Sequence, residues 1–92
     1  MALLAEEQIQ QQLAGSEWAR DGGTIVREYK LADFAAAIAF VNRVAELAQD
    51  ANHHPDILVH GWNKVRLELS THSEGGLTDA DFALALQIDG LS

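Results

Sequence analysis

Glycine residues divide this chain of 92 residues into short segments, and their spacing constrains the fold more than any other feature. The breaks fall at Gly15, Gly22–Gly23, Gly61 and Gly75–Gly76. Glycine favours turns and the ends of helices, so each segment has room for one or two secondary-structure elements. A chain of this length also builds only one core, and we therefore expect a single domain over residues 1–92.

Three segments have the composition and end signals of helices. Residues 5–14 are strong helix formers that stop before Gly15. Asp33 is placed to cap the longest helix, which should run to about residue 50, and Thr78 is placed to cap the last one. Asp81 follows Thr78 at the spacing of a capping box, and this role is sufficient to explain it.

Helical spacing predicts which apolar side chains of these helices face the core. For the longest helix the expected stripe is Phe34, Ile38, Val41, Ala45 and Ala48, widened by Phe40, Val44 and Leu47. For the last helix the expected inward residues are Phe82, Ala85, Leu86 and Ile88. The stripe on the longest helix is wider than one sheet needs, which leaves room for a subunit contact.

Four segments read as strands, at residues 17–20, 24–31, 57–60 and 65–69. In the last of them apolar residues alternate with Lys64, Arg66 and Glu68, as in a strand with one buried face. Arg27 conflicts with the second strand, because it falls on the face that should be buried. The element order αββαββα predicts an α+β fold, a four-stranded antiparallel sheet with helices packed on one face.

Composition excludes several classes of function. Fourteen acidic residues against six basic ones give a net charge of -8, and the basic residues are scattered, so direct nucleic-acid binding is not expected. The absence of cysteine excludes disulfides and thiolate chemistry. We find no secretion signal and no membrane-spanning segment, and we expect a cytoplasmic protein without membrane contact.

All four histidines lie between residues 53 and 72. His53 and His54 leave the longest helix at a corner made rigid by Pro55, and His72 follows the strand at 65–69. Pairing of the last two strands would bring these three histidines together, whereas His60 reads as solvent-facing. Imidazoles titrate near neutrality, so acid–base catalysis is the first option. Zinc binding is the second, although no HExxH spacing is present.

Serine hydrolysis has weaker support than either option. Ser70 and Ser73 lie near His72, but the sequence contains no G-x-S-x-G nucleophile elbow.

Two stretches, "NHHPD" and "NKVRLELSTHSEGGLTDADF", closely resemble the pterin-4a-carbinolamine dehydratases. The signature of that family is His-His-Pro, a following strand that ends in Thr-His, and Gly-Leu-Thr or Gly-Leu-Ser before a helix that contains Asp. The resemblance implies dehydration of 4a-hydroxytetrahydrobiopterin to quinonoid dihydropterin, a lyase step in tetrahydrobiopterin recycling. It also implies a homodimer or homotetramer and a functional link to an aromatic amino acid hydroxylase, with no metal or redox cofactor.

The resemblance also implies roles for individual residues. His53 and His72 match the acid–base pair of the family, and His54 matches the histidine that orients the pterin. The positions that match residues lining the pterin site are Asn52, Ser70, Thr71 and Ser73. Trp18 matches a tryptophan near that site, but a half-buried strand aromatic would explain it equally well.

The sequence departs from the family pattern at three places. Gln49 stands where the family usually has an acidic residue, which puts tuning of the histidines by that carboxylate in doubt. One extra residue precedes Trp62, and a bulge at Gly61 would absorb it, with Trp62 serving packing or an interface. Asn52 stands where some relatives have Asp.

Two readings compete with the enzyme. One is a non-catalytic binding module of the same fold, either a dimerisation cofactor of transcription factors or an assembly chaperone. The other is a metal-binding domain. Retention of all three histidines favours the enzyme, because a scaffold does not need them.

Overall fold

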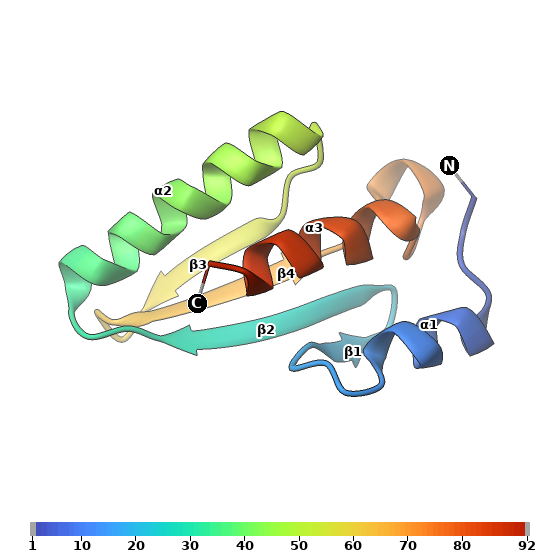
Figure 1. Cartoon of the computed structure of the whole chain (residues 1–92), viewed down its shortest axis with the longest axis horizontal. Coiled ribbons are helices and arrows are strands. Elements are labelled where there is room, and N and C mark those ends of the chain that lie inside the picture. Colours follow the sequence, from blue (N-terminus) through green and yellow to red (C-terminus); the bar gives the residue numbers. More distant parts are fainter. Residues whose placement is uncertain (1, 92) are drawn as a thin grey trace.

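A computed structural model describes residues 2–91 of the chain, and its element order confirms the predicted αββαββα fold (Figure 1). The helices are α1 (Glu6–Leu13), α2 (Phe34–Ala51) and α3 (Asp79–Asp89), with a short 3₁₀-helix, η1 (His72–Glu74), before α3. The strands are β1 (Ala19–Asp21), β2 (Thr24–Lys30), β3 (Asp56–His60) and β4 (Lys64–Leu69). The 3₁₀-helix was not predicted from the sequence.

The four strands form one antiparallel sheet in the order β1-β2-β4-β3. Ile25 and Tyr29 on β2 pair with Leu69 and Val65 on β4, so these side chains share one face. That face belongs to the buried core, to which α1, α2 and α3 all contribute apolar side chains. Helices thus cover one face of the sheet, as the sequence predicts.

The predicted helix caps are also present. The Asp33 side chain accepts a hydrogen bond from the Ala36 N–H at 2.8 Å at the start of α2. Thr78 and Asp81 form the capping box of α3. No helix within residues 2–91 combines the length and the apolar character needed to cross a membrane.

Arg27 does lie on the inner face of β2, as the alternation requires, and the structure accounts for it. Its guanidinium carbon lies 4.4 Å from the centre of the Tyr29 ring. Its Nη1 lies 2.6 Å from Oδ1 of Asp89 on α3. A buried charge is tolerated when it is paired, so this arginine closes the edge of the core without disrupting the strand.

The predicted core face of α2 is partly wrong. The buried residues are Ala37, Phe40, Val44 and Ala48, whereas Phe34 and Ile38 are 56% and 37% exposed and Ala45 is exposed. Three of the four buried residues, Phe40, Val44 and Ala48, belong to the predicted set. The prediction centred the face on Phe34, Ile38 and Ala45 and left out Ala37, so it was rotated about the helix axis.

The predicted core face of α3 is wrong at one position. Leu86 is 74% exposed, while Leu84 is buried together with Ala85 and Ile88. The buried set also contains Asp81, and the spacing from Asp81 to Ile88 follows one helical face. The sequence prediction left Asp81 out of this face and included Leu86.

The predicted bulge at Gly61 is also wrong. β3 pairs with β4 without interruption up to His60 and Lys64, and the extra residue lies in the turn between them. Gly61 and Trp62 both have positive φ angles, 54° and 58°. Asn63 ties this turn to the end of β2, because its side chain donates to the Leu31 carbonyl at 3.1 Å.

Candidate active site

The C-terminus of α2 and the connection from β4 to α3 lie at the same end of the sheet (Figure 1). Asn52 ends α2 in the left-handed conformation, with φ 50° and ψ 42°, which asparagine adopts more readily than most residues. The His53 N–H then donates to the Ala48 carbonyl at 3.1 Å. This turn fixes the direction in which His53 and His54 leave the helix.

His53 contacts a buried carboxylate. Its Nε2 lies 2.6 Å from Oδ1 of Asp81, and the two side chains are 15% and 0% exposed. Asp81 lies on the first turn of α3, 28 positions further along the chain. The contact therefore joins the α2–β3 corner to the start of the last helix.

Two threonines complete the surroundings of Asp81. Its Oδ2 accepts from the Thr71 hydroxyl at 2.8 Å and from the Thr78 N–H at 2.9 Å. The two threonine hydroxyls are 2.8 Å apart, and since Thr71 gives its hydrogen to Asp81, Thr78 donates to Thr71. Donors thus converge on the carboxylate, so we assign the hydrogen of the remaining contact to His53 Nε2. In the neutral ring, Nδ1 is then the basic nitrogen.

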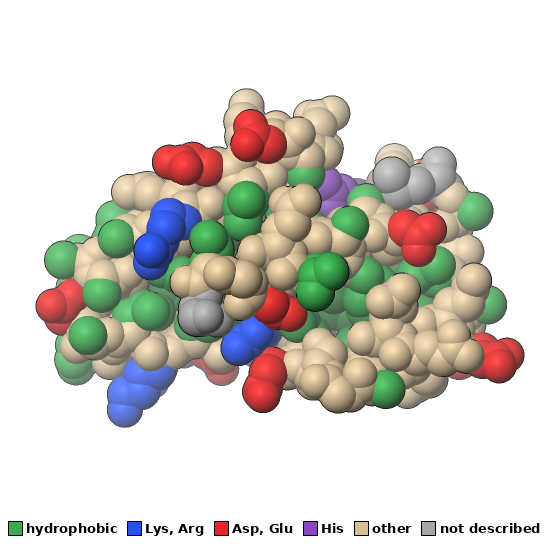
Figure 2. Space-filling view, in the orientation of Figure 1, with side chains coloured by type: hydrophobic (Ala, Val, Ile, Leu, Met, Phe, Trp, Pro, Cys, Tyr) green, Lys and Arg blue, Asp and Glu red, His purple; other side chains and the backbone are tan. Residues whose placement is uncertain are grey.

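A pocket of about 250 Å³ opens beside this network. Its lining brings together all the predicted site residues except Trp18: Asn52, His53, His54, Ser70, Thr71, His72 and Ser73. A histidine surface is visible near the end of α2 in Figure 2. Three imidazoles from two segments of the chain therefore share one pocket.

The two other histidines of the pocket differ from His53 in their surroundings. His54 is exposed, and its Nε2 lies 3.1 Å from Oε1 of Gln49 on the last turns of α2. His72 is exposed at the start of η1, in a loop closed by a bridge between Thr71 and Gly76. His60 lies outside the pocket and contacts Glu28 at 2.5 Å.

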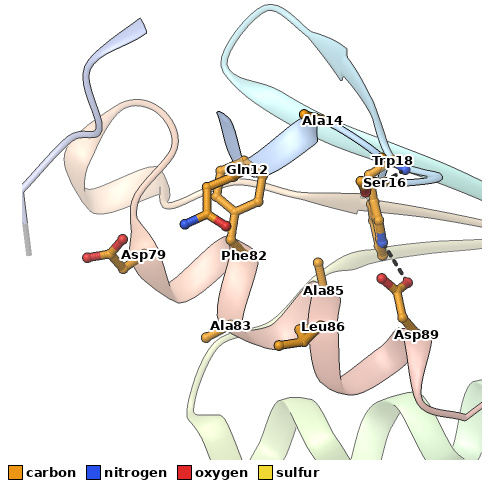
Figure 3. A pocket seen from close by; sticks show the side chains of 11 residues that line it. Gln12, Ala14, Ser16, Trp18, Asp79, Phe82, Ala83, Ala85, Leu86 and Asp89 are labelled. Carbon is orange, nitrogen blue, oxygen red and sulfur yellow. Dashed lines mark hydrogen bonds between the residues drawn. The ribbon is translucent and has the colours of Figure 1, made fainter. Parts of the chain in front are cut away.

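Trp18 is not part of this pocket. It is 5% exposed, and its Nε1 donates to Asp89 Oδ1 at 2.8 Å. It lines a second, larger cavity of about 460 Å³ between α1 and α3 (Figure 3). Phe82, Leu86 and Asp89 line the same cavity from the α3 side.

Sequence reasoning missed the contacts of Asp81 and Gln49 with the histidines. Asp81 has the position of a helix cap, and a cap alone gives no sign of a second partner. Gln49 was noted as a departure from the family, and its contact is with His54. The sequence signal for the Gln49–His54 contact was their separation of five residues across the end of α2.

The described residues offer no ready metal site. Between residues 2 and 91, no three His, Asp or Glu side chains are arranged so that they could hold a metal ion. The polar groups of the pocket are instead suited to hydrogen bonding and proton transfer with a small molecule.

Comparisons with known proteins identify the family of the chain. The family described as pterin 4 alpha carbinolamine dehydratase matches residues 2–91. A protein of Chloroflexus aurantiacus, provisionally named a pterin-4-alpha-carbinolamine dehydratase, is 53% identical over 90 residues, which cover 97% of this chain and 96% of that one. A similarly named protein of Nocardia farcinica is 50% identical over 91 residues, covering 98% and 95%.

Solved structures share the fold. A protein from Brucella melitensis, described as a transcriptional coactivator/pterin dehydratase, superposes with a TM-score of 0.90 at 29% identity and covers 97% of both chains. A pterin dehydratase-like protein described as a RuBisCO assembly factor of the alpha-carboxysome has a TM-score of 0.65 at 23% identity, covering 80% of this chain and 84% of that one. With the match over residues 2–91, this chain belongs to the pterin-4-alpha-carbinolamine dehydratase family.

Proposed function

We propose that this protein dehydrates 4a-hydroxytetrahydrobiopterin to quinonoid dihydropterin by histidine acid–base catalysis, in tetrahydrobiopterin recycling. The observation that carries the proposal is the contact of His53 with the buried carboxylate of Asp81, in a pocket that His54 and His72 also line. A histidine oriented by a buried carboxylate is an established design for moving protons. The family assignment supports the same reaction.

The proposed reaction removes the 4a-hydroxyl as water and the proton from N5 of the pterin. Asp81 orients the His53 ring and stabilises the imidazolium that forms when Nδ1 accepts a proton. This arrangement favours His53 as the base that takes the N5 proton. His72, exposed at the pocket rim, would donate the proton that leaves with the hydroxyl.

The other lining residues would hold the substrate. Asn52, Ser70, Thr71 and Ser73 supply backbone and side-chain hydrogen-bonding groups around the pocket, and His54 would orient the ring. Trp18 is left out of the proposed site, because its indole lines the other cavity.

The test is the rate of dehydration of substrate generated in situ by a phenylalanine hydroxylase, measured by absorbance with chelator-treated protein. His53→Ala and His72→Ala should each lower turnover by about 10²–10⁴-fold, the usual contribution of a positioned proton transfer. His60→Ala is the matched control, because His60 lies outside the pocket. Losses below tenfold in both site variants would refute the assignment, and an inactive wild-type protein would refute the activity.

A binding module of the same fold is the second candidate. Exposed apolar side chains at Phe34, Ile38 and Trp62 favour it, since such side chains are common where proteins bind each other. If wild-type protein fails to accelerate the dehydration, this candidate moves to first place.

We further propose that the protein is a homodimer or homotetramer that acts with an aromatic amino acid hydroxylase. β3 lies at an edge of the sheet, and α2 exposes Phe34 and Ile38. Light scattering at micromolar concentration should give the mass of a dimer or tetramer. The mass of a monomer would contradict the oligomeric state without affecting the proposed chemistry.

A further inference from the structure

Gln49 and His54 form a side-chain pair across the end of α2. Gln49 Oε1 lies 3.1 Å from His54 Nε2, and both side chains are exposed. The pair exists because Asn52 turns the backbone sharply after α2, which returns His54 toward the last turns of the helix.

The chemistry of the two atoms decides where the ring carries its hydrogen. Gln49 turns its amide oxygen toward the ring, and an oxygen accepts, so His54 Nε2 carries the hydrogen in this orientation; the same amide turned over would donate to Nε2 instead. In the neutral imidazole the other nitrogen, Nδ1, then carries none and can only accept. In this orientation of the Gln49 amide, His54 offers an acceptor nitrogen to a ligand.

The neighbouring histidine has a different anchor. His53 Nε2 meets the buried carboxylate of Asp81, whereas His54 Nε2 meets a neutral amide at the surface. A carboxylate stabilises a protonated ring, whereas an amide hydrogen-bonds the ring without adding charge. The two adjacent histidines are therefore suited to different tasks.

We infer that Gln49 is a positioning residue that holds His54 as the Nε2–H tautomer, so that His54 Nδ1 accepts a hydrogen bond from the substrate. The inference rests on the proposed function, and it adds that the ligand must present an N–H donor to this side of the pocket. A reduced pterin carries such N–H groups on its ring. Gln49 would thus contribute to substrate binding through His54 without touching the substrate.

The tautomer of His54 can be observed directly by NMR on ¹⁵N-histidine-labelled protein at a pH where the ring is neutral, with His54→Ala used for assignment. Wild-type protein should show Nε2–H for His54. Gln49→Leu, which removes the acceptor, should give a mixture of tautomers. Gln49→Glu keeps an acceptor oxygen at the same place and should restore Nε2–H.

Gln11→Leu is the matched control, since Gln11 is an exposed glutamine on α1, outside the histidine pocket. It should leave the His54 spectrum unchanged. An Nδ1–H tautomer in the wild-type protein, or a Gln49→Leu spectrum identical to wild type, would overturn the inference.

Kinetics test the consequence for binding. Losing one oriented hydrogen bond should raise KM by about tenfold in Gln49→Leu while kcat changes by less than about threefold. Gln49→Glu should restore most of the KM. Active wild type with an unchanged KM in Gln49→Leu would refute the role of Gln49 alone. Inactive wild type would refute the proposed function, and the NMR result would still decide the tautomer.

Discussion

The two cavities of this molecule differ in size and in chemistry, and the smaller one holds the groups that can move protons. The larger, of about 460 Å³, has an apolar floor between α1 and α3 (Figures 2 and 3). The smaller, of about 250 Å³, is lined by three histidines and four other polar residues. The lining of the larger cavity contains no histidine, so volume and proton-transfer chemistry point to different regions.

α3 takes part in both regions through different faces. Asp81 points from its first turn toward His53, while Phe82, Leu86 and Asp89 face the larger cavity. The carboxylate of Asp89 is already engaged by Arg27 and by the Trp18 indole. We therefore expect a change at Asp81 to affect catalysis and a change at Asp89 to affect stability alone.

The largest expected effect is that of Asp81→Asn. The amide keeps the shape of the side chain but places an N–H₂ group among the donors from His53, Thr71 and Thr78. Turnover should fall by about 10²–10⁴-fold, and the free energy of unfolding should fall by about 1–3 kcal/mol. The measurements are the dehydration assay and urea denaturation.

Asp79→Asn is the control for that change, because Asp79 lies on the same helical turn but lines the larger cavity and not the histidine pocket (Figure 3). If Asp81→Asn keeps its turnover within threefold of wild type, Asp81 does not contribute to catalysis and the contrast between the two cavities is refuted.

Asp89→Asn should lower stability and leave catalysis intact. It weakens the 2.6 Å contact with Arg27 and the 2.8 Å bond from Trp18, at side chains that are mostly buried. We expect the free energy of unfolding to fall by about 1–3 kcal/mol, the cost of poorly paired polar groups, with turnover unchanged. A loss of turnover like that of Asp81→Asn would break the distinction between the two faces of α3.

Tyr29 should make stability depend on pH in the alkaline range. Burial raises the pKa of Tyr29 to about 12, from an ordinary value of 10.0. The unfolded chain therefore loses this proton first, so the free energy of unfolding is at its full value below about pH 10 and falls as the pH rises toward 12. Tyr29 is the one tyrosine of the sequence, so phenolate absorbance reports on it alone.

The matched variant is Tyr29→Phe, which should abolish this part of the pH dependence. A phenolate titration in the folded protein with its midpoint at the ordinary value would contradict the burial of this ring beside Arg27.

The smallest expected effect is that of Leu86→Gln. Leu86 is 74% exposed at the edge of the larger cavity, and surface substitutions of this kind usually change stability by less than about 0.5 kcal/mol. Turnover should not change. A cost above about 1 kcal/mol would show that something covers this cavity in solution, and light scattering of the variant would then test for a second copy.

Local sequence patterns predicted the helices and strands well, because strand alternation and helix caps depend on residues close together in the chain. Alternation in Val65–Leu69 predicted β4, and Asp33 and Thr78 marked the starts of α2 and α3. The rotation of α2 was not predictable in the same way, since the approach of Ala37 to the sheet depends on packing that periodicity does not encode.

The sequence predicted only those residues of the candidate site that belong to the family motifs. His-His-Pro and Thr-His named the residues that line the pocket, and pairing of β3 with β4 brings them together. The contact between His53 and Asp81 joins positions 28 apart. The family signature includes an Asp in this helix, but neither the signature nor the capping position identifies His53 as its partner. Trp18 differs from these residues, because its indole lines the larger cavity while the family match predicts it near the pterin.

The double use of Asp81 has a consequence for how the protein should respond to heat. The same carboxylate holds the first turn of α3 and the ring of His53, so fraying of that turn releases the histidine. Loss of activity on warming should then follow the exchange of the amide hydrogens at the start of α3, at temperatures where the sheet is still intact. The last helix would in this way set the upper temperature at which the pocket remains assembled.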